Sequence, residues 1–408
     1  YPIFILLISF IMAEYLSRDI LEDGLVRSFA PIRVLQTALG SARVDAKYRF
    51  VTSPTLGQKV YTAALMLAAT VSYVTTVYCY ISHFKHHSYL RYLCQIGMSL
   101  HYVTHAASII HSRFLNNESN VRFYVKLQEI DRSMRIDRTS YFHDMLYRIN
   151  LMNTLLYTVM YFVFSAILFF RNLHLQVFFA SGIFLVQFTC TLEWIYFSNL
   201  IVHIYSRLSF INMIMSNHLR SISSFHSDNV SEWKILDTRS LRELAQETND
   251  FRTSETDKYL NKIFNLIHNF TGLYRFQMFV FCFKLVVMSL AIFEFCLLTL
   301  QQNVSLSIPN SHFYFSCVGD LALLIFICVR WERFFKEMNE TKHLSTTILA
   351  TYTEGPLRKK ATTMLKTIEE TPPHFSVYDM WNMDGSTLLN ILSIITTLIV
   401  TLLQFSLL

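Results

Sequence analysis

The chain has 408 residues, of which 52% are hydrophobic and 15% aromatic, and it carries a formal net charge of +6. This apolar content exceeds that of soluble globular proteins and predicts a protein that lives in lipid. The seven cysteines fall within apolar segments and show no CxxC spacing, which argues against a disulfide framework or a zinc site.

The apolar runs of the chain indicate membrane spans. The first thirteen residues are too short to cross a bilayer, and no basic residue precedes them as in a signal peptide, so we expect an interfacial or buried segment. Further along, seven runs approach the length that crosses roughly 30 Å of hydrocarbon. The predicted spans are 60–82, 92–112, 149–170, 176–205, 276–302, 311–329 and 386–405. The sequence therefore predicts an all-α membrane protein with seven transmembrane helices.

The lysines and arginines lie mainly on one side of these spans. Thirty of the 35 fall in the N-terminal segment and in three loops on that side. The three on the other side are Lys85, Arg91 and Arg171. Because basic loops stay in the cytoplasm, we expect a cytoplasmic N-terminus and an extracellular C-terminus, the reverse of a G-protein-coupled receptor. Only Asn303 among the N-x-S/T sequons would then face outside.

Ionisable residues inside the predicted spans are candidates for function, because charge in hydrocarbon is costly. Counting from the outer helix ends places Glu193 and Lys284 both roughly 27 Å deep, so we expect them to pair. Glu294 and Asp320 lie about 12 to 14 Å from the outside by the same count. An acidic pair at that depth would favour a cationic ligand such as an alkaloid, although it could also hydrogen-bond sugar hydroxyls.

Few other motifs suggest chemistry. His101 and His105 have the i, i+4 spacing of a helical metal site, but no third ligand is evident, so interhelical hydrogen bonding is the better interpretation. The chain has no phosphate loop, nucleophile elbow or HExxH motif, which makes an enzyme unlikely on sequence grounds. No metal, cofactor or nucleic-acid partner is expected.

The loop 332–383 contains the segment EGPLRKKATTMLKTIEETPP, which predicts an amphipathic helix that ends before Pro372. Its apolar stripe consists of Leu357, Ala361, Met364, Leu365 and Ile368. We expect this stripe to be buried against the rest of the protein. The alternative is a basic helix that rests on anionic lipid, since Arg358, Lys359 and Lys360 lie beside the stripe.

The last span carries a narrow polar stripe on an otherwise apolar helix. The stripe consists of Ser386, Asn390, Ser393, Thr397, Thr401 and Gln404. In hydrocarbon such a stripe must face a neighbouring helix or water. The alternative is that the hydroxyls only bond to carbonyls of their own helix, which explains Gln404 less well than the threonines.

The motif TLIVTLLQF, residues 397–405, resembles the C-terminal signature of insect gustatory receptors, which is Thr-Tyr, five hydrophobic residues and Gln-Phe. HFSVYDMWNMDGSTLL, residues 374–389, resembles the segment that leads into their last helix, and PIRVLQTALG, residues 31–40, resembles their N-terminal motif. Leu398 replaces the signature Tyr, and Ile399 stands where the sweet-receptor branch carries Glu.

This resemblance implies a homotetrameric, ligand-gated, weakly selective cation channel with four copies of the last helix around the pore. The implied pore residues are Ser393, Thr397, Val400, Thr401, Leu403 and Gln404, with Val400 or Leu403 closing the pore by dewetting. Residues at outer-half depth form the expected tastant pocket, by depth and not by motif. They are Tyr73, Tyr78, Gln95, Ser99, Tyr161, Gln187, Glu294, Tyr314 and Asp320.

The expected partners are a small-molecule tastant, the cations Na⁺, K⁺ and Ca²⁺, the lipid bilayer, and further copies of the chain or other gustatory receptors. A bitter or plant-derived ligand is preferred to a fructose-type sugar. An odorant receptor, a metabotropic seven-helix receptor and a transporter are the alternatives. The predicted organisation begins with an N-terminal cytoplasmic segment 1–58, transmembrane helices 1 to 4 in 59–205 and a cytoplasmic loop with helical extensions in 206–275. It continues with transmembrane helices 5 and 6 in 276–331, a cytoplasmic anchor region 332–383 and the pore-lining helix 7 in 384–408.

Overall fold

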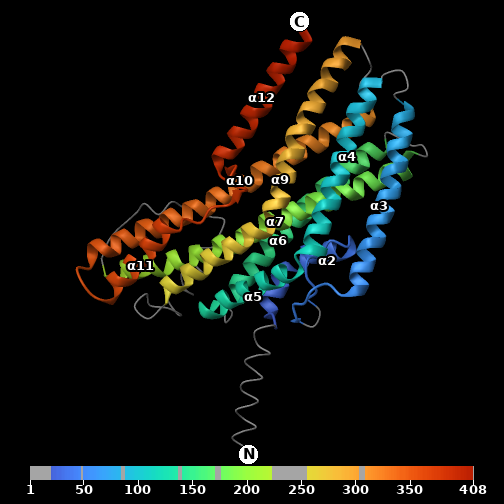
Figure 1. Ribbon diagram of the computed structural model, residues 1–408. Coiled ribbons are helices and arrows are strands. Elements are labelled where there is room, and N and C mark those ends of the chain that lie inside the picture. The colour runs from blue at the N-terminus through green and yellow to red at the C-terminus, as the bar shows by residue number, and fades with distance from the viewer. Residues whose placement is uncertain are drawn as a thin grey trace, which may run out of the picture.

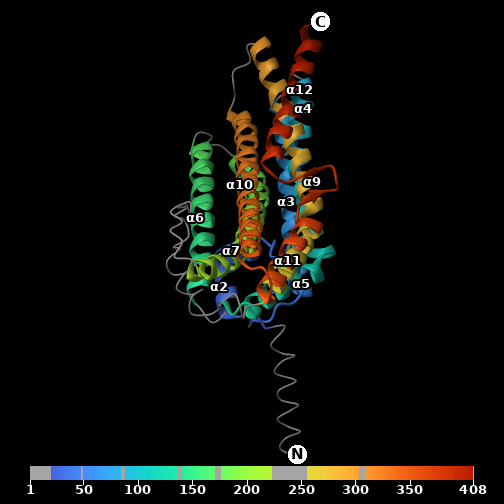
Figure 2. The ribbon, with the colours of Figure 1, turned by 90° about the vertical axis from the view of Figure 1, so that its left-hand side faces the viewer.

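A computed structural model describes residues 20–46, 49–83, 88–136, 140–170, 176–222, 255–302 and 308–407. These residues form a bundle of long helices with one small β-hairpin (Figures 1 and 2). The apolar segment at the start of the chain, for which we expect an interfacial or buried position, lies outside the described residues, as does Asn303.

The elements carry the labels of Figure 1. The helices are α2 Asp23–Ala38, α3 Leu56–His83, α4 Ser88–Ile110, the π-helix η2 His111–Leu115, α5 Asn117–Ser133, α6 Ser140–Phe170, α7 Gln176–Ile222, α9 Thr256–Gln302, α10 Ile308–Thr351, α11 Pro356–Glu370 and α12 Gly385–Leu407. The hairpin pairs β1, Ser376–Val377, with β2, Trp381–Asn382, in antiparallel register.

All seven predicted spans lie in helices, so the all-α class is confirmed. The span 92–112 ends in η2 because α4 changes to a π-helix at His111. Among the described residues, Leu185–Arg220 and Thr256–Glu294 are long and apolar enough to cross a membrane, and Gly385–Thr401 is a shorter apolar helix. The other crossings and the orientation of the chain remain predictions.

Helix α7 is the centre of the bundle. In its most apolar stretch 94% of the residues are buried, whereas in the corresponding stretch of α9 only 39% are buried. Helix α7 packs against α10, α3 and α6, and Phe197, Leu200 and Ile201 are almost completely buried. The apolar side chains of α7 therefore form the protein core, while much of α9 is left for other neighbours.

Helix α6 exposes a wide apolar face. Its exposed side chains are Leu151, Met152, Leu155, Leu156, Val159, Met160, Phe162 and Val163. Helix α3 also exposes Leu67, Val71 and Val74. Water-soluble monomers rarely expose apolar patches this large, whereas hydrocarbon solvates them without cost. The outer faces of α3 and α6 are those of a protein embedded in a membrane.

Three helices are much longer than a bilayer requires. Helices α7 and α9 have 47 residues each and α10 has 44. These lengths correspond to roughly 65 to 70 Å, about twice the hydrocarbon thickness. One end of each helix therefore projects beyond the hydrocarbon, and α11 packs beside the projecting parts of α9 and α10 (Figure 2).

Helix α11 confirms the predicted amphipathic helix. It ends at Glu370, before Pro372, and it buries Leu357, Ala361, Met364 and Ile368. Leu365 is only half-buried. Because the apolar stripe is covered by α9 and α10, it is not available to insert into lipid as the alternative interpretation requires.

An aromatic cluster joins the projecting helices to the hairpin. The ring of Phe375, just before β1, lies 5.7 Å from that of Phe197 on α7 and 5.6 Å from that of Trp331 on α10. Phe270 on α9 stacks 5.0 Å from Phe197. Phe375 is completely buried, so the segment that leads into α12 is anchored in the core.

Candidate functional site

A buried ion pair joins α9 to α10 within the predicted spans. Lys284 Nζ lies 2.7 Å from Asp320 Oδ2, and the two side chains are 2% and 5% exposed. On α4, His101 Nδ1 lies 3.4 Å from Lys284 Nζ, and His101 Nε2 lies 2.8 Å from Ser316 Oγ. The charge of Asp320 is thus neutralised within the chain, which removes the basis for a cationic ligand at this residue.

Two predicted ligand residues lie among the buried side chains of α6 and α7. Tyr161, a predicted ligand residue, is buried with its ring 4.8 Å from that of Phe188. Tyr157 hydrogen-bonds to Thr191 and lies within electrostatic range of Asp320. Gln187, also predicted, is 6% exposed, and its Oε1 has no hydrogen-bond partner in the structure. Three predicted ligand residues, Tyr161, Gln187 and Asp320, are therefore buried within the helix bundle.

The other predicted ligand residues lie in less enclosed places. Tyr73 on α3 donates a 2.9 Å hydrogen bond to Ser99 on α4, and its ring stacks 4.8 Å from that of Tyr102. Tyr78 is 75% exposed on α3. Gln95 and Glu294 are half-buried. The side chain of Tyr314 lies outside the described part of the structure. The single chain does not enclose Tyr78 or Ser99.

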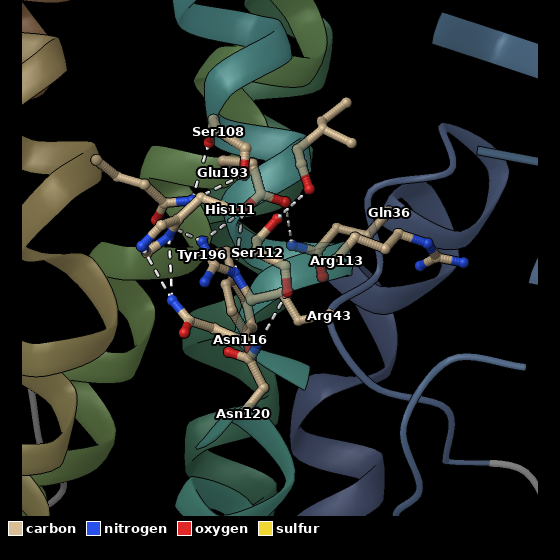
Figure 3. Close-up of polar contacts among 12 residues, drawn as sticks. Gln36, Arg43, Ser108, His111, Ser112, Arg113, Asn116, Asn120, Glu193 and Tyr196 are labelled. Atoms are coloured by element: carbon tan, nitrogen blue, oxygen red, sulfur yellow. Dashed lines mark hydrogen bonds and ion pairs between the residues drawn. The ribbon is translucent and has the colours of Figure 1, made fainter. Parts of the chain in front are cut away.

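A second buried ion pair is centred on Glu193 of α7 (Figure 3). Arg43 Nη2 donates to Glu193 Oε2 at 2.9 Å, and Arg43 Nε donates to the same oxygen at 3.1 Å. Gln36 Nε2 donates to Glu193 Oε1 at 3.0 Å. The guanidinium of Arg43 also lies 4.2 Å from the centre of the Tyr274 ring. The predicted pairing of Glu193 with Lys284 is wrong, since Arg43 neutralises Glu193 and Asp320 neutralises Lys284.

The segment 31–46 holds Arg43 in this position. Helix α2 buries Ile32 and Gln36 on one face. The helix ends in a tight turn at Gly40, whose φ of 66° is the left-handed region that glycine adopts most easily. The chain then passes between helices, so that Arg43 reaches Glu193 from outside the predicted spans.

Gln277 connects the Glu193 ion pair to α4. Its Oε1 accepts a 2.7 Å hydrogen bond from Arg43, and its Nε2 donates to Ser108 Oγ at 3.0 Å. A small cavity lies beside this contact, lined by Thr104, Ser108, Cys190, Trp194, Phe276, Gln277 and Val280. Its volume of about 10 Å³ is enough for roughly one water molecule. This cavity lies between α4, α7 and α9 and is too small for a tastant.

Most side chains of helix α12 are exposed in the single chain. Thr387 and Ile391 near its start are buried, and the helix contacts α9 and α10. Ser393, Thr397, Thr401 and Gln404 are exposed, Val400 is 47% exposed, and Leu403 is half-buried. Thr397 and Thr401 donate to the carbonyls of Ser393 and Thr397 at 2.8 and 2.9 Å. Because these hydroxyl protons bond within the helix, the oxygen lone pairs remain free to accept from outside.

The start of α12 is fixed by a reciprocal cap. The backbone nitrogen of Thr387 donates to Asp384 Oδ1 at 3.0 Å, and the backbone nitrogen of Asp384 donates to Thr387 Oγ1 at 3.2 Å. Partial burial raises the pKa of Asp384, but hydrogen bonds from Ser386 and Thr387 outweigh this effect and lower the pKa below its ordinary value. The cap thus depends on an ionised Asp384.

Sequence reasoning missed several buried polar contacts. Arg207 on α7 forms two hydrogen bonds of 2.7 and 2.6 Å with the carboxylate of Asp131 on α5, and both side chains are almost completely buried. Arg43 and Gln277 were not expected either. Arg43 follows directly after the motif 31–40, and this position could have indicated a partner for a buried acid.

The comparisons with known proteins agree with this architecture. A family model described as 7tm Chemosensory receptor matches residues 46–408. No curated protein matches the chain significantly. The matched range includes Glu193, the ion pair of Lys284 with Asp320 and the whole of α12, whereas Arg43 lies just before it. The family is not an enzyme family. The chain therefore belongs to the 7tm chemosensory receptor family, a family of helical membrane proteins that includes receptors of the insect gustatory and odorant type.

Proposed function

We propose that this chemosensory receptor is a tastant-gated, weakly selective cation channel in the plasma membrane of chemosensory neurons. The observation that carries the proposal is the exposure of α12 in the single chain. A helix with Thr397, Thr401 and Gln404 on its surface, among exposed apolar side chains, needs a polar environment for one face and an apolar one for the others. Four such helices around an aqueous pore meet both requirements.

In this arrangement the polar stripe lines the pore. The hydroxyl oxygens of Thr397 and Thr401 and the amide of Gln404 would replace part of the hydration shell of Na⁺, K⁺ or Ca²⁺. Val400, with almost half of its surface uncovered, would form an apolar ring that closes the pore by excluding water. The pore would belong to a homotetramer or to a heteromer with other gustatory receptors, because one helix cannot enclose it.

The proposed ligand is an uncharged bitter or plant-derived molecule. Support comes from the clustered aromatic side chains of Tyr157, Tyr161 and Phe188 and from the unpartnered oxygen of Gln187. The ion pair of Lys284 with Asp320 leaves no net charge to attract an alkaloid cation. An uncharged ligand can accept or donate hydrogen bonds there without breaking the pair.

The test is whole-cell recording from a heterologous cell that expresses this chain alone, with protein at the surface verified by labelling. Neutral bitter compounds, cationic alkaloids and sugars are applied in turn, and Na⁺ is then replaced by a bulky impermeant cation. We expect an inward current with the neutral compounds that disappears on replacement. We also expect Gln404→Ala and Val400→Ala channels to differ from the parent in permeation and in closing, respectively.

Different results would contradict separate parts of the proposal. Gln404→Ala and Val400→Ala channels that conduct and close like the parent would show that α12 does not line the pore. A response that depends on intracellular second messengers, without unitary current steps, would favour a metabotropic receptor. Responses confined to cationic alkaloids would contradict the uncharged ligand.

A further inference from the structure

The segment Phe375–Met383 forms a compact hairpin immediately before α12. Phe375, Val377 and Met383 are completely buried. The backbone nitrogen of Met383 donates to the carbonyl of Phe375 at 2.9 Å, and Val377 pairs with Trp381. A movement of this hairpin must therefore displace the start of α12, because Met383 and the capping residue Asp384 are consecutive.

The tip of the hairpin has an unusual backbone. Tyr378 and Asp379 have φ values of 52° and 57°, and the nitrogen of Met380 donates to the carbonyl of Val377 at 3.0 Å. Two successive residues with positive φ are typical of a type I′ turn, for which Asn and Gly are the usual residues. A tyrosine in this conformation is strained and persists only where surrounding contacts hold it.

The contacts that hold the tip come from α9. The guanidinium of Arg275 lies 4.7 Å from the centre of the Tyr378 ring, a cation–π contact. The ring of Phe279, one turn further along α9, lies 5.8 Å from Tyr378 and 6.4 Å from Trp381. Ser376 Oγ donates to Asp379 Oδ1 at 3.0 Å within the hairpin itself.

Helix α9 also contributes one residue to each of the two buried polar networks of the candidate site. Gln277 bonds Arg43 and Ser108, and Lys284 pairs with Asp320 and contacts His101. Arg275 and Phe279 lie on the same helix, so a displacement or rotation of α9 at either contact would also move them. The hairpin therefore offers a route, beside the direct contacts of the two helices, through which α9 can act on the start of α12.

We propose that Arg275 and Tyr378 are positioning residues that couple α9 to the start of α12, with the strained turn as the part that moves. This inference rests on the proposed channel function for its gating role. The coupling itself is a property of the folded chain and can be measured without current.

The experiment uses the full-length protein and four variants. Arg275→Gln removes the cation but keeps a long polar side chain. Tyr378→Asn removes the ring, and asparagine suits a positive φ. Faster exchange in this variant would therefore come from the lost contact and not from added backbone strain. The double variant tests whether the two residues act together, and Tyr378→Phe is the matched control because it keeps the ring over which the guanidinium lies.

Hydrogen–deuterium exchange is measured on the purified proteins. We expect Arg275→Gln and Tyr378→Asn each to speed amide exchange in residues 376–391 several-fold, the double variant to add little, and Tyr378→Phe to match the parent. Exchange in α10 serves as the internal reference and should not change. Unaltered exchange in 376–391 in both single variants, or effects that add independently, would overturn the coupling.

Currents from the same variants then test the gating role. We expect the two single changes to shift the agonist concentration for half-maximal current in the same direction and by a similar factor, without further shift in the double variant. Parent-like concentration dependence in variants whose exchange is altered would overturn the gating role. A parent that passes no agonist-evoked current would contradict the proposed channel instead, and the exchange result would still decide the coupling.

Discussion

At the scale of single residues, the buried pair of Lys284 and Asp320 should behave as a unit. Removing one partner leaves an uncompensated charge in a site where both side chains are at most 5% exposed, which costs about 3 to 5 kcal/mol. We expect Lys284→Met and Asp320→Leu each to lower the unfolding temperature of the detergent-purified protein. The double variant should recover much of the loss, and a double variant no more stable than the weaker single one would contradict a direct pair.

Two adjacent threonines of α12 offer a matched comparison. Thr396 and Thr397 are both exposed, and both donate to a carbonyl of the same helix at 2.8 Å. Only Thr397 belongs to the polar stripe. We expect Thr397→Ala to lower the unitary conductance several-fold and Thr396→Ala to leave it unchanged. Equal conductance in the two variants would place the pore on another face.

At the scale of elements, the turn after α2 should depend on a glycine. A Cβ added at Gly40 would lie 2.9 Å from Leu65 Cδ1, and φ there is 66°. We expect Gly40→Ala to cost more than about 1 kcal/mol, measured as a lower unfolding temperature. Gly57→Ala is the control, because its Cβ would meet nothing within 4 Å. A Gly40→Ala protein as stable as the control would show that the turn relaxes.

The elements also show why some predictions succeed. Helix α11 was predicted correctly because its stripe repeats at helical spacing and Pro372 cannot continue a helix. The η2 segment His111–Leu115 carried no comparable signal. A π-helical turn depends on how the ends of α4 and α5 meet their neighbours, for example Arg113, which donates to the carbonyl of Ala42, and a local pattern contains no such information.

At the scale of the whole molecule, the orientation in the membrane can be tested by glycosylation. The charge bias places Asn303 outside and Asn339 inside. We expect Asn303→Gln to abolish a glycosidase-sensitive shift on gels and Asn339→Gln to preserve it. A glycan on Asn339 or Asn117 would contradict the predicted cytoplasmic N-terminus. In the structure, α2 and the C-terminal end of α12 lie at opposite ends of the bundle (Figure 1), as the prediction requires.

The sequence by itself determined the apolar spans, the amphipathic helix α11 and the membrane-type class, because hydrophobic runs and helical periodicity are local properties of the chain. It also carried the motifs that indicated a chemosensory receptor. It did not give the full lengths of α7, α9 and α10, whose projecting parts are less apolar. Which charges pair was decided only by the tertiary structure. Counting residues along a helix estimates depth, but it ignores tilt and rotation, and α7 and α10 run obliquely to α3 and α4 (Figure 1). Glu193 consequently meets Arg43, from a segment with no periodicity, and Lys284 meets Asp320.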